Sequence, residues 1–198
     1  MIPSQFALLG ALIAALGGFY YLYETVVGKS KPNRVTWLLW FIFPMLAFFA
    51  QISQGVGLIA WVSFVSGFTP LLIFIASFFN KKAYWKTTRI DYVCFLASIV
   101  GISLWAITKN ANLAIIFSII ADLFAALPTL IKCYKQPETE SWLAYGLSTI
   151  GFGFTILTIQ NFSFQAAAFV MYLTAINGVM AILASRKPSR DILQFEPV

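Results

Sequence analysis

One acidic residue lies deep inside a long apolar stretch of this sequence. Asp122 falls about ten residues into the run Leu113–Cys133, which is roughly 15 Å along a helix. A carboxylate at that depth in an apolar surrounding costs several kcal/mol unless it is paired or protonated. We interpret Asp122 as a candidate for proton coupling or for a hydrogen bond to a solute. The structural alternative is a neutral, protonated carboxyl group that bonds a neighbouring helix.

Two further polar residues lie in the middle of apolar runs, and they align when the chain is shifted by 111 residues. Asn177 and Ser66 are candidates for binding a polar solute, with Trp61 and Tyr172 as aromatic platforms beside them. The structural alternatives are a hydrogen bond between helices for the polar residues and plain packing for the rings. The aligned pairs are Trp61 with Tyr172, Ser66 with Asn177, and Gly67 with Gly178.

Three prolines interrupt apolar runs that are otherwise typical of helices. Pro44, Pro70 and Pro128 each remove a backbone hydrogen bond and permit a kink. They are hinge candidates, with bent packing as the alternative. The small-residue runs "GALIAALGG" and "GLSTIGFG" are typical of close contact between helices.

The composition indicates the elements that must position these residues. The chain has 198 residues, of which 60% are hydrophobic and 10% are charged, whereas about 25% of the residues of a soluble protein are charged. We therefore expect an all-α integral membrane protein. Seven runs approach the roughly 20 residues that a transmembrane helix needs. They are Phe6–Val27, Val35–Ile52, Val56–Phe79, Tyr92–Thr108, Leu113–Cys133, Trp142–Ile159 and Phe164–Ser185.

If the chain crosses the membrane seven times, twelve of the 13 basic residues lie on one side of the membrane and Lys109 alone lies on the other. Because basic residues gather in cytoplasmic loops, this predicts an outside N-terminus and a cytoplasmic C-terminus. The same bias explains the net charge of +6 without nucleic acid as a partner. Trp37, Trp85 and Trp142 are then expected at the cytoplasmic face, as an aromatic belt.

A second alignment, at a shift of 105 residues, indicates an internal repeat. It matches Pro32 with Pro137, Thr36 with Ser141, and Trp37 with Trp142. We expect a three-helix bundle in residues 1–80 and a second one, with a cytoplasmic tail, in residues 112–198. A cytoplasmic loop and a linker helix in residues 81–111 would let both bundles run in the same direction. Parallel repeats of this kind place a solute site near the membrane midplane.

The layout resembles the PQ-loop and SWEET superfamily, whose three-helix bundles carry a Pro-Gln motif near the inner end of the first helix. Leu127-Pro128-Thr129, followed by "KQPETESW", is similar to that motif with Thr in place of Gln, and Tyr23-Glu24 occupies the position in the first copy. In this resemblance Asn177 corresponds to a pocket asparagine, and Ser66 stands at its partner position. Bacterial nicotinamide riboside transporters and KDEL-type sorting receptors share the layout, and small bacterial membrane proteins of similar length resemble the chain. The resemblance implies a bacterial inner membrane.

We expect a small-molecule transporter that works by alternating access, with sugars and vitamins as solute classes and proton coupling left open. A membrane receptor or scaffold on the same fold is the alternative. The expected partners are the lipid bilayer and a small polar solute, with no cofactor or metal and with a homo-oligomer left open. An enzyme is not expected, because the sequence has no histidine and no Ser-Lys pair within a span.

Overall fold

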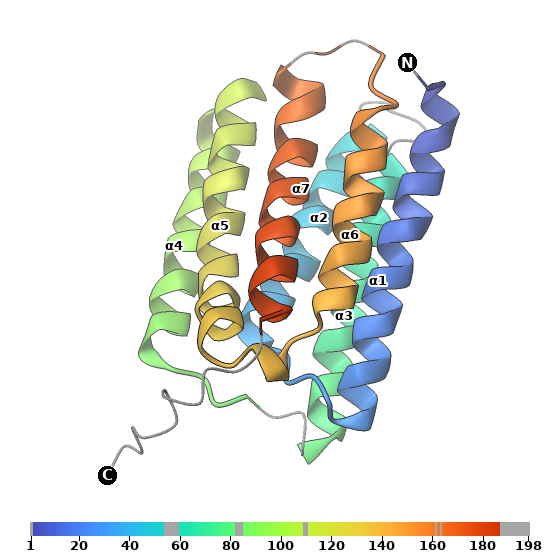
Figure 1. Cartoon of the computed structure of the whole chain (residues 1–198). Helices are drawn as coiled ribbons and strands as arrows, with labels where there is room; N and C mark the ends of the chain where they lie inside the picture. The colour runs from blue at the N-terminus through green and yellow to red at the C-terminus, as the bar shows by residue number, and fades with distance from the viewer. Residues whose placement is uncertain are drawn as a thin grey trace.

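The computed structural model describes residues 2–53, 60–81, 85–108, 111–160, 162 and 164–186. These residues form seven α-helices and no strand (Figure 1). Short 3-10 helices, η1 (Ser4–Phe6) and η4 (Pro137–Thr139), precede α1 and α6. The α-helices are α1 (Ala7–Val27), α2 (Arg34–Ser53), α3 (Ala60–Phe79), α4 (Arg89–Thr108), α5 (Ala111–Lys135), α6 (Trp142–Ile156) and α7 (Phe164–Ala184).

The all-helical prediction is confirmed, and each helix coincides with one of the seven predicted runs. Among the described ends, the largest differences are at the start of α4, which is Arg89 rather than Tyr92, and at the end of α6, which is Ile156 rather than Ile159. There the chain turns, and the backbone N–H of Ile2 donates to the carbonyl oxygen of Leu157 at 3.2 Å. The predicted start of the third run at Val56 and three groups of basic residues lie outside the described residues. These groups are Lys82, Lys109, and the Lys187 and Arg190 of the tail.

Three helical segments are long and apolar enough to cross a membrane. They are Ser4–Val27, Trp61–Phe79 and Ala167–Ala184. Arg34–Met45 and Trp142–Ile156 form shorter apolar helices. These lengths and compositions are those of a membrane protein, since about 20 apolar residues in a helix span the hydrocarbon core.

The helices lie side by side and alternate in direction (Figure 1). α1 packs against α3 and α6, and α3 also packs against α2. α7 packs against α5 and α6, while α4 lies mainly on α5. The ends of α1, α3, α5 and α7 meet the starts of α2, α4 and α6 at one end of the molecule. We call this the basic end, because its described loops and helix ends carry Lys29, Lys31, Arg34, Lys81, Lys86, Arg89, Lys132, Lys135 and Arg186.

Small residues bring α1 and α6 into direct backbone contact. A Cβ atom added to Gly151 of α6 would lie 2.5 Å from the carbonyl oxygen of Gly10 and 2.6 Å from the backbone nitrogen of Ala14. A Cβ atom added to Gly17 of α1 would lie 2.5 Å from the carbonyl oxygen of Ala144. The two small-residue runs thus face each other, as their sequence indicates, and close packing holds these helices together.

The contact between α1 and α6 predicts that Gly151→Ala destabilises the protein. The new methyl group would overlap backbone atoms that cannot rotate away, and overpacking of this kind costs about 1–3 kcal/mol. We expect a lower midpoint of thermal unfolding for the purified protein in detergent. Gly146→Ala, on the same helix, is the matched control, because a Cβ atom there meets nothing within 4 Å. Equal midpoints for the two variants would contradict this account of the α1–α6 contact.

Candidate functional site

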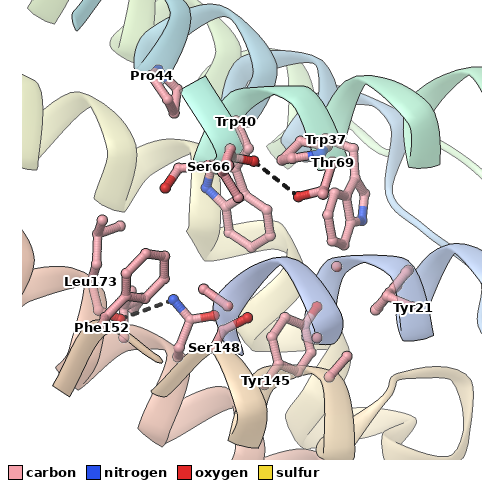
Figure 2. A pocket seen from close by; sticks show the side chains of 18 of the residues that line it. Tyr21, Trp37, Trp40, Pro44, Ser66, Thr69, Tyr145, Ser148, Phe152 and Leu173 are labelled. Carbon is pink, nitrogen blue, oxygen red and sulfur yellow. Dashed lines mark hydrogen bonds between the residues drawn. The ribbon is translucent and has the colours of Figure 1, made fainter. Parts of the chain in front are cut away.

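A cavity of about 80 Å³ lies among six of the seven helices. A single water needs about 10–15 Å³ by this measure, so the cavity has room for several waters or a small solute. Figure 2 shows Trp40 and Ser66 on one side of it and Tyr145 and Ser148 on the other. Its lining consists of Ala14, Gly17, Gly18, Tyr21, Trp37, Trp40, Pro44, Val65, Ser66, Thr69, Pro70, Asp122, Ala144, Tyr145, Ser148, Phe152, Leu173, Ile176 and Asn177.

The three polar residues that the sequence singles out all line this cavity. Asp122 comes from α5, Ser66 from α3 and Asn177 from α7. The hydroxyl group of Ser66 donates to the carbonyl oxygen of Val62 at 2.8 Å, and the amide nitrogen of Asn177 donates to that of Leu173 at 2.9 Å. Both side chains therefore satisfy a donor within their own helix while they border the cavity. Their role as solute ligands stays a prediction.

Asp122 is only 3% exposed and accepts a hydrogen bond from a neutral donor. The hydroxyl group of Tyr172 donates to Asp122 Oδ2 at 2.7 Å, and the indole of Trp40 lies near the same carboxyl group. Tyr172 thus contacts Asp122 but is not itself part of the cavity lining. A carboxyl group in this setting satisfies its hydrogen bonds without a basic partner.

The other predicted residues divide between the cavity and its surroundings. Pro44 and Pro70 line the cavity, whereas Pro128 lies inside α5 away from it. The hydroxyl group of Thr36 donates to the carbonyl oxygen of Ala125, in the turn before Pro128. Trp61 is 46% exposed and packs against Phe48 and Phe64, so it is not part of the lining. The hinge role of the prolines stays a prediction.

The expectation that Trp37 belongs to an aromatic belt at the membrane surface is wrong. Trp37 is 5% exposed, lines the cavity, and packs against Tyr21 and Trp40 with ring centroids 4.5 and 5.1 Å away. Its indole N–H lies beside Tyr21 but has no acceptor at hydrogen-bonding distance among the described residues. Trp142, its partner in the repeat, is 54% exposed. The two equivalent tryptophans of the repeat therefore lie in different environments: Trp37 is buried and Trp142 is exposed.

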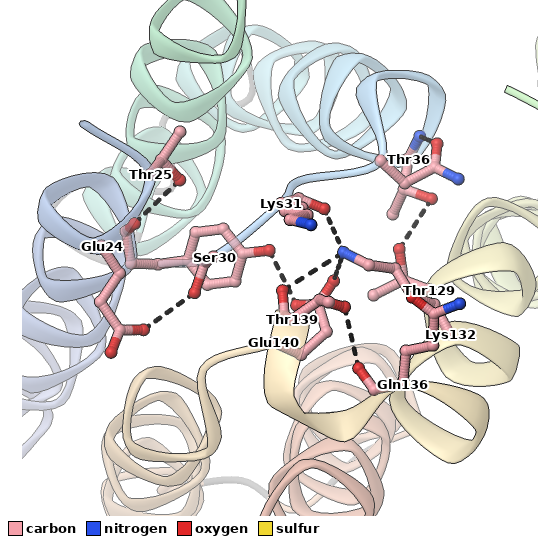
Figure 3. A network of polar contacts seen from close by, with 12 residues as sticks. Glu24, Thr25, Ser30, Lys31, Thr36, Thr129, Lys132, Gln136, Thr139 and Glu140 are labelled. Atoms are coloured by element: carbon pink, nitrogen blue, oxygen red, sulfur yellow. Dashed lines mark hydrogen bonds and ion pairs between the residues drawn. The ribbon is translucent and has the colours of Figure 1, made fainter. Parts of the chain in front are cut away.

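A buried ion pair lies between the cavity and the basic end, where the sequence predicted only a polar loop. Lys132 Nζ lies 2.6 Å from Glu140 Oε1, and both side chains are completely buried. Figure 3 shows the lysine reaching across to the loops that precede α2 and α6. It donates to the carbonyl oxygen of Lys31 and, at 3.4 Å, to that of Thr139.

The ion pair also reaches the floor of the cavity. The hydroxyl groups of Tyr21 and Tyr145 donate to Glu140 Oε2 at 2.7 and 2.8 Å, and both tyrosines line the cavity. The backbone N–H of Lys31 donates to the carbonyl oxygen of Thr139 at 2.9 Å, which joins the two loops directly. We call the set Tyr21, Lys132, Glu140 and Tyr145 the polar lock.

A second hollow, of about 310 Å³, lies on the other side of the polar lock at the basic end. Glu24, Glu138 and Glu140 line it together with Lys29. Lys29 Nζ lies 2.5 Å from Glu24 Oε1, and the hydrogen bond and negative charge of that carboxylate raise the pKa of Lys29. Glu140 thus borders this hollow, while its hydrogen-bonded tyrosines border the cavity.

The polar lock was missed by sequence reasoning because its members look ordinary in isolation. Lys132 reads as one of several basic residues at a helix end, and Glu140 as part of the polar segment before Trp142. The available signal was the apolar surrounding of Lys132 in "TLIKCY", which leaves little room for a solvated ammonium group. A lysine in such a position needs an acid within reach.

The polar lock predicts that Lys132→Met destabilises the protein by about 3–5 kcal/mol, because it leaves Glu140 buried without a counter-charge. Chemical denaturation of the purified protein would measure the change. Lys135→Met is the matched control, since Lys135 is exposed at the end of the same helix and exposed charges contribute about 0–1 kcal/mol. The double variant Lys132→Met with Glu140→Gln should recover part of the loss. Similar losses for Lys132→Met and Lys135→Met would contradict the buried pairing.

Among the described residues, no group of three His, Cys, Asp or Glu side chains is arranged to hold a metal ion. Comparison with protein-family models, with curated proteins and with solved structures finds no match to this chain.

Proposed function

We propose that this protein is a small-molecule transporter of the membrane, working by alternating access between two three-helix units. All seven helices would cross the bilayer, with the basic end in the cytoplasm. The observation that carries the proposal is the cavity that both units line, which is mainly apolar but is bordered by an acid, an amide and several hydroxyl groups. A mainly apolar pocket with a few polar groups is typical of a site for a small molecule.

The order of neighbouring helices supports the two units. α3 contacts both α1 and α2, and α7 likewise contacts both α5 and α6. Between the units, α1 packs on α6 and α2 packs on α5. These are the equivalent contacts of a twofold arrangement in which α1 corresponds to α5 and α2 to α6. Parallel repeats related by an axis along the membrane normal form their solute site at this interface.

The repeat-related residues Ser66 and Asn177 support the location of the solute site. They meet in the sequence alignment, and both border the same cavity. Equivalent residues of a parallel duplication lie at similar depth on opposite sides of the axis. A solute in the cavity would therefore contact one polar residue from each unit.

The polar lock supports a state that is closed at the basic end. Its hydrogen bonds connect α1, α5 and α6 across the two units. Opening the basic end requires these bonds to be exchanged for water or for a solute. Pro44 and Pro70, at the cavity wall, would allow α2 and α3 to bend during that change. Asp122, which borders the cavity, is the group through which a proton could be coupled to the cycle.

A receptor or scaffold is the second candidate, and the polar lock is the observation that favours it. A cavity held closed at one face by a buried ion pair could bind a ligand without passing it on. Net movement of a solute across the membrane separates the two functions.

Transport can be tested with the full chain in proteoliposomes, by counterflow of radiolabelled glucose, thiamine and choline. We expect accumulation of at least one of these probes. For that probe, Asn177→Ala should lower the rate roughly two- to tenfold, the equivalent of a lost hydrogen bond of about 0.5–1.5 kcal/mol.

Thr174→Ala is the matched control for Asn177→Ala. Thr174 lies on the same helix and also donates to a carbonyl oxygen four residues earlier, that of Val170, but it does not line the cavity. Its rate should stay close to that of the unaltered protein. Binding of a probe without accumulation would favour the receptor function, and equal losses in the two variants would contradict the solute site.

A further inference from the structure

We propose that the solute in this cavity is a small organic cation that also carries a hydrogen-bond acceptor. This inference rests on the transport function proposed above and names its substrate class. It follows from the acid and the aromatic rings that line the cavity and from one indole N–H without an acceptor, each taken in turn below.

The lining combines one acid with several electron-rich rings. Among the described lining residues, Asp122 is the one acidic residue, and none is basic. Four of the others are tyrosine or tryptophan: Tyr21, Trp37, Trp40 and Tyr145. Figure 2 shows Trp40 and Tyr145 on facing sides of the space. Rings of this type attract ammonium groups through their faces, and a carboxylate supplies the counter-charge. An inorganic cation would instead need several oxygen ligands.

Asp122 has no cationic partner within the described protein. Its hydrogen-bond donor is the hydroxyl group of Tyr172, and the indole of Trp40 lies nearby; both groups are neutral. The described ion pairs involve Glu24 and Glu140 instead. A buried carboxylate that a neutral donor orients, but that no basic group neutralises, is a binding site for a positive charge.

Trp37 adds a requirement for an acceptor atom on the same solute. Trp37 lines the cavity, and its buried indole N–H, beside Tyr21, has no acceptor at hydrogen-bonding distance among the described residues. An unpaired buried donor costs free energy that an acceptor on a ligand would recover. A protonated or quaternary amine with a hydroxyl or carbonyl oxygen satisfies both Asp122 and Trp37.

The direct test compares a cation with its neutral twin. Choline and 3,3-dimethylbutan-1-ol have the same shape and hydroxyl group, but only choline is charged. We expect choline to bind the purified full chain at least about tenfold more tightly, measured by calorimetry and by the shift in thermal unfolding. Ethanolamine tests a protonated amine in the same assay.

Substitutions test whether the preference for choline over the neutral alcohol arises in the cavity. Asp122→Asn should remove the advantage of choline over its neutral twin. Trp37→Phe should weaken binding of choline more than binding of tetramethylammonium, which has no acceptor. Glu138→Gln is the control, because it removes an exposed acid outside the cavity and should change affinity less than about threefold. If Asp122→Asn fails to fold, the choline comparison on the unaltered protein decides alone.

Three results would overturn the cation proposal: equal binding of choline and its twin, no binding of any amine, or stabilisation by sodium alone that Asp122→Asn removes. Transport of glucose without binding of amines would reject the cation but keep the proposed transport function. Absence of transport for every probe in proteoliposomes would reject the transport function itself.

Discussion

The buried ion pair between Lys132 and Glu140 constrains this structure more than any other interaction. Lys132 and Glu140 can stay charged only if every donor and acceptor around them is satisfied. That requirement draws in the hydroxyl groups of Tyr21 and Tyr145 and the carbonyl oxygens of two loops. It fixes where α1, α5 and α6 meet at the basic end, and it defines the floor of the cavity.

The polar lock and the glycine contact have different consequences for motion. Backbone contact between α1 and α6 at Gly10, Gly17 and Gly151 is non-polar packing that changes little with water entry. The lock consists of charges and hydrogen bonds, which water or a cationic solute can replace. In the proposed transport cycle, the basic end would open by an exchange of partners around Glu140, while the packed face between α1 and α6 would act as the rigid side. In a receptor, the lock would instead stay closed throughout.

The sequence predicted the helices and singled out three polar residues of the cavity lining, because those features are local. Long apolar runs specify helices, small-residue runs indicate close contact, and Asp122, Ser66 and Asn177 stand out as polar residues in apolar surroundings. The polar lock was not predictable in this way, because Glu140 and Tyr21 are far apart in the chain and meet only after α1 packs on α6. Trp37 shows the same limit: its place near a predicted loop favoured the membrane surface, whereas its neighbours Tyr21 and Trp40 bury it.

The central claim is that the cavity opens in turn to both faces of the membrane, and thiol labelling of its wall tests this most directly. Ser66→Cys, in a protein whose buried Cys94 and Cys133 are replaced by alanine, can be reacted with an impermeant methanethiosulfonate in right-side-out and inside-out vesicles. The account predicts reaction from both faces, and a faster reaction from the basic end when Glu140→Gln weakens the polar lock. Reaction from one face alone, unchanged by Glu140→Gln, or from neither face would contradict it.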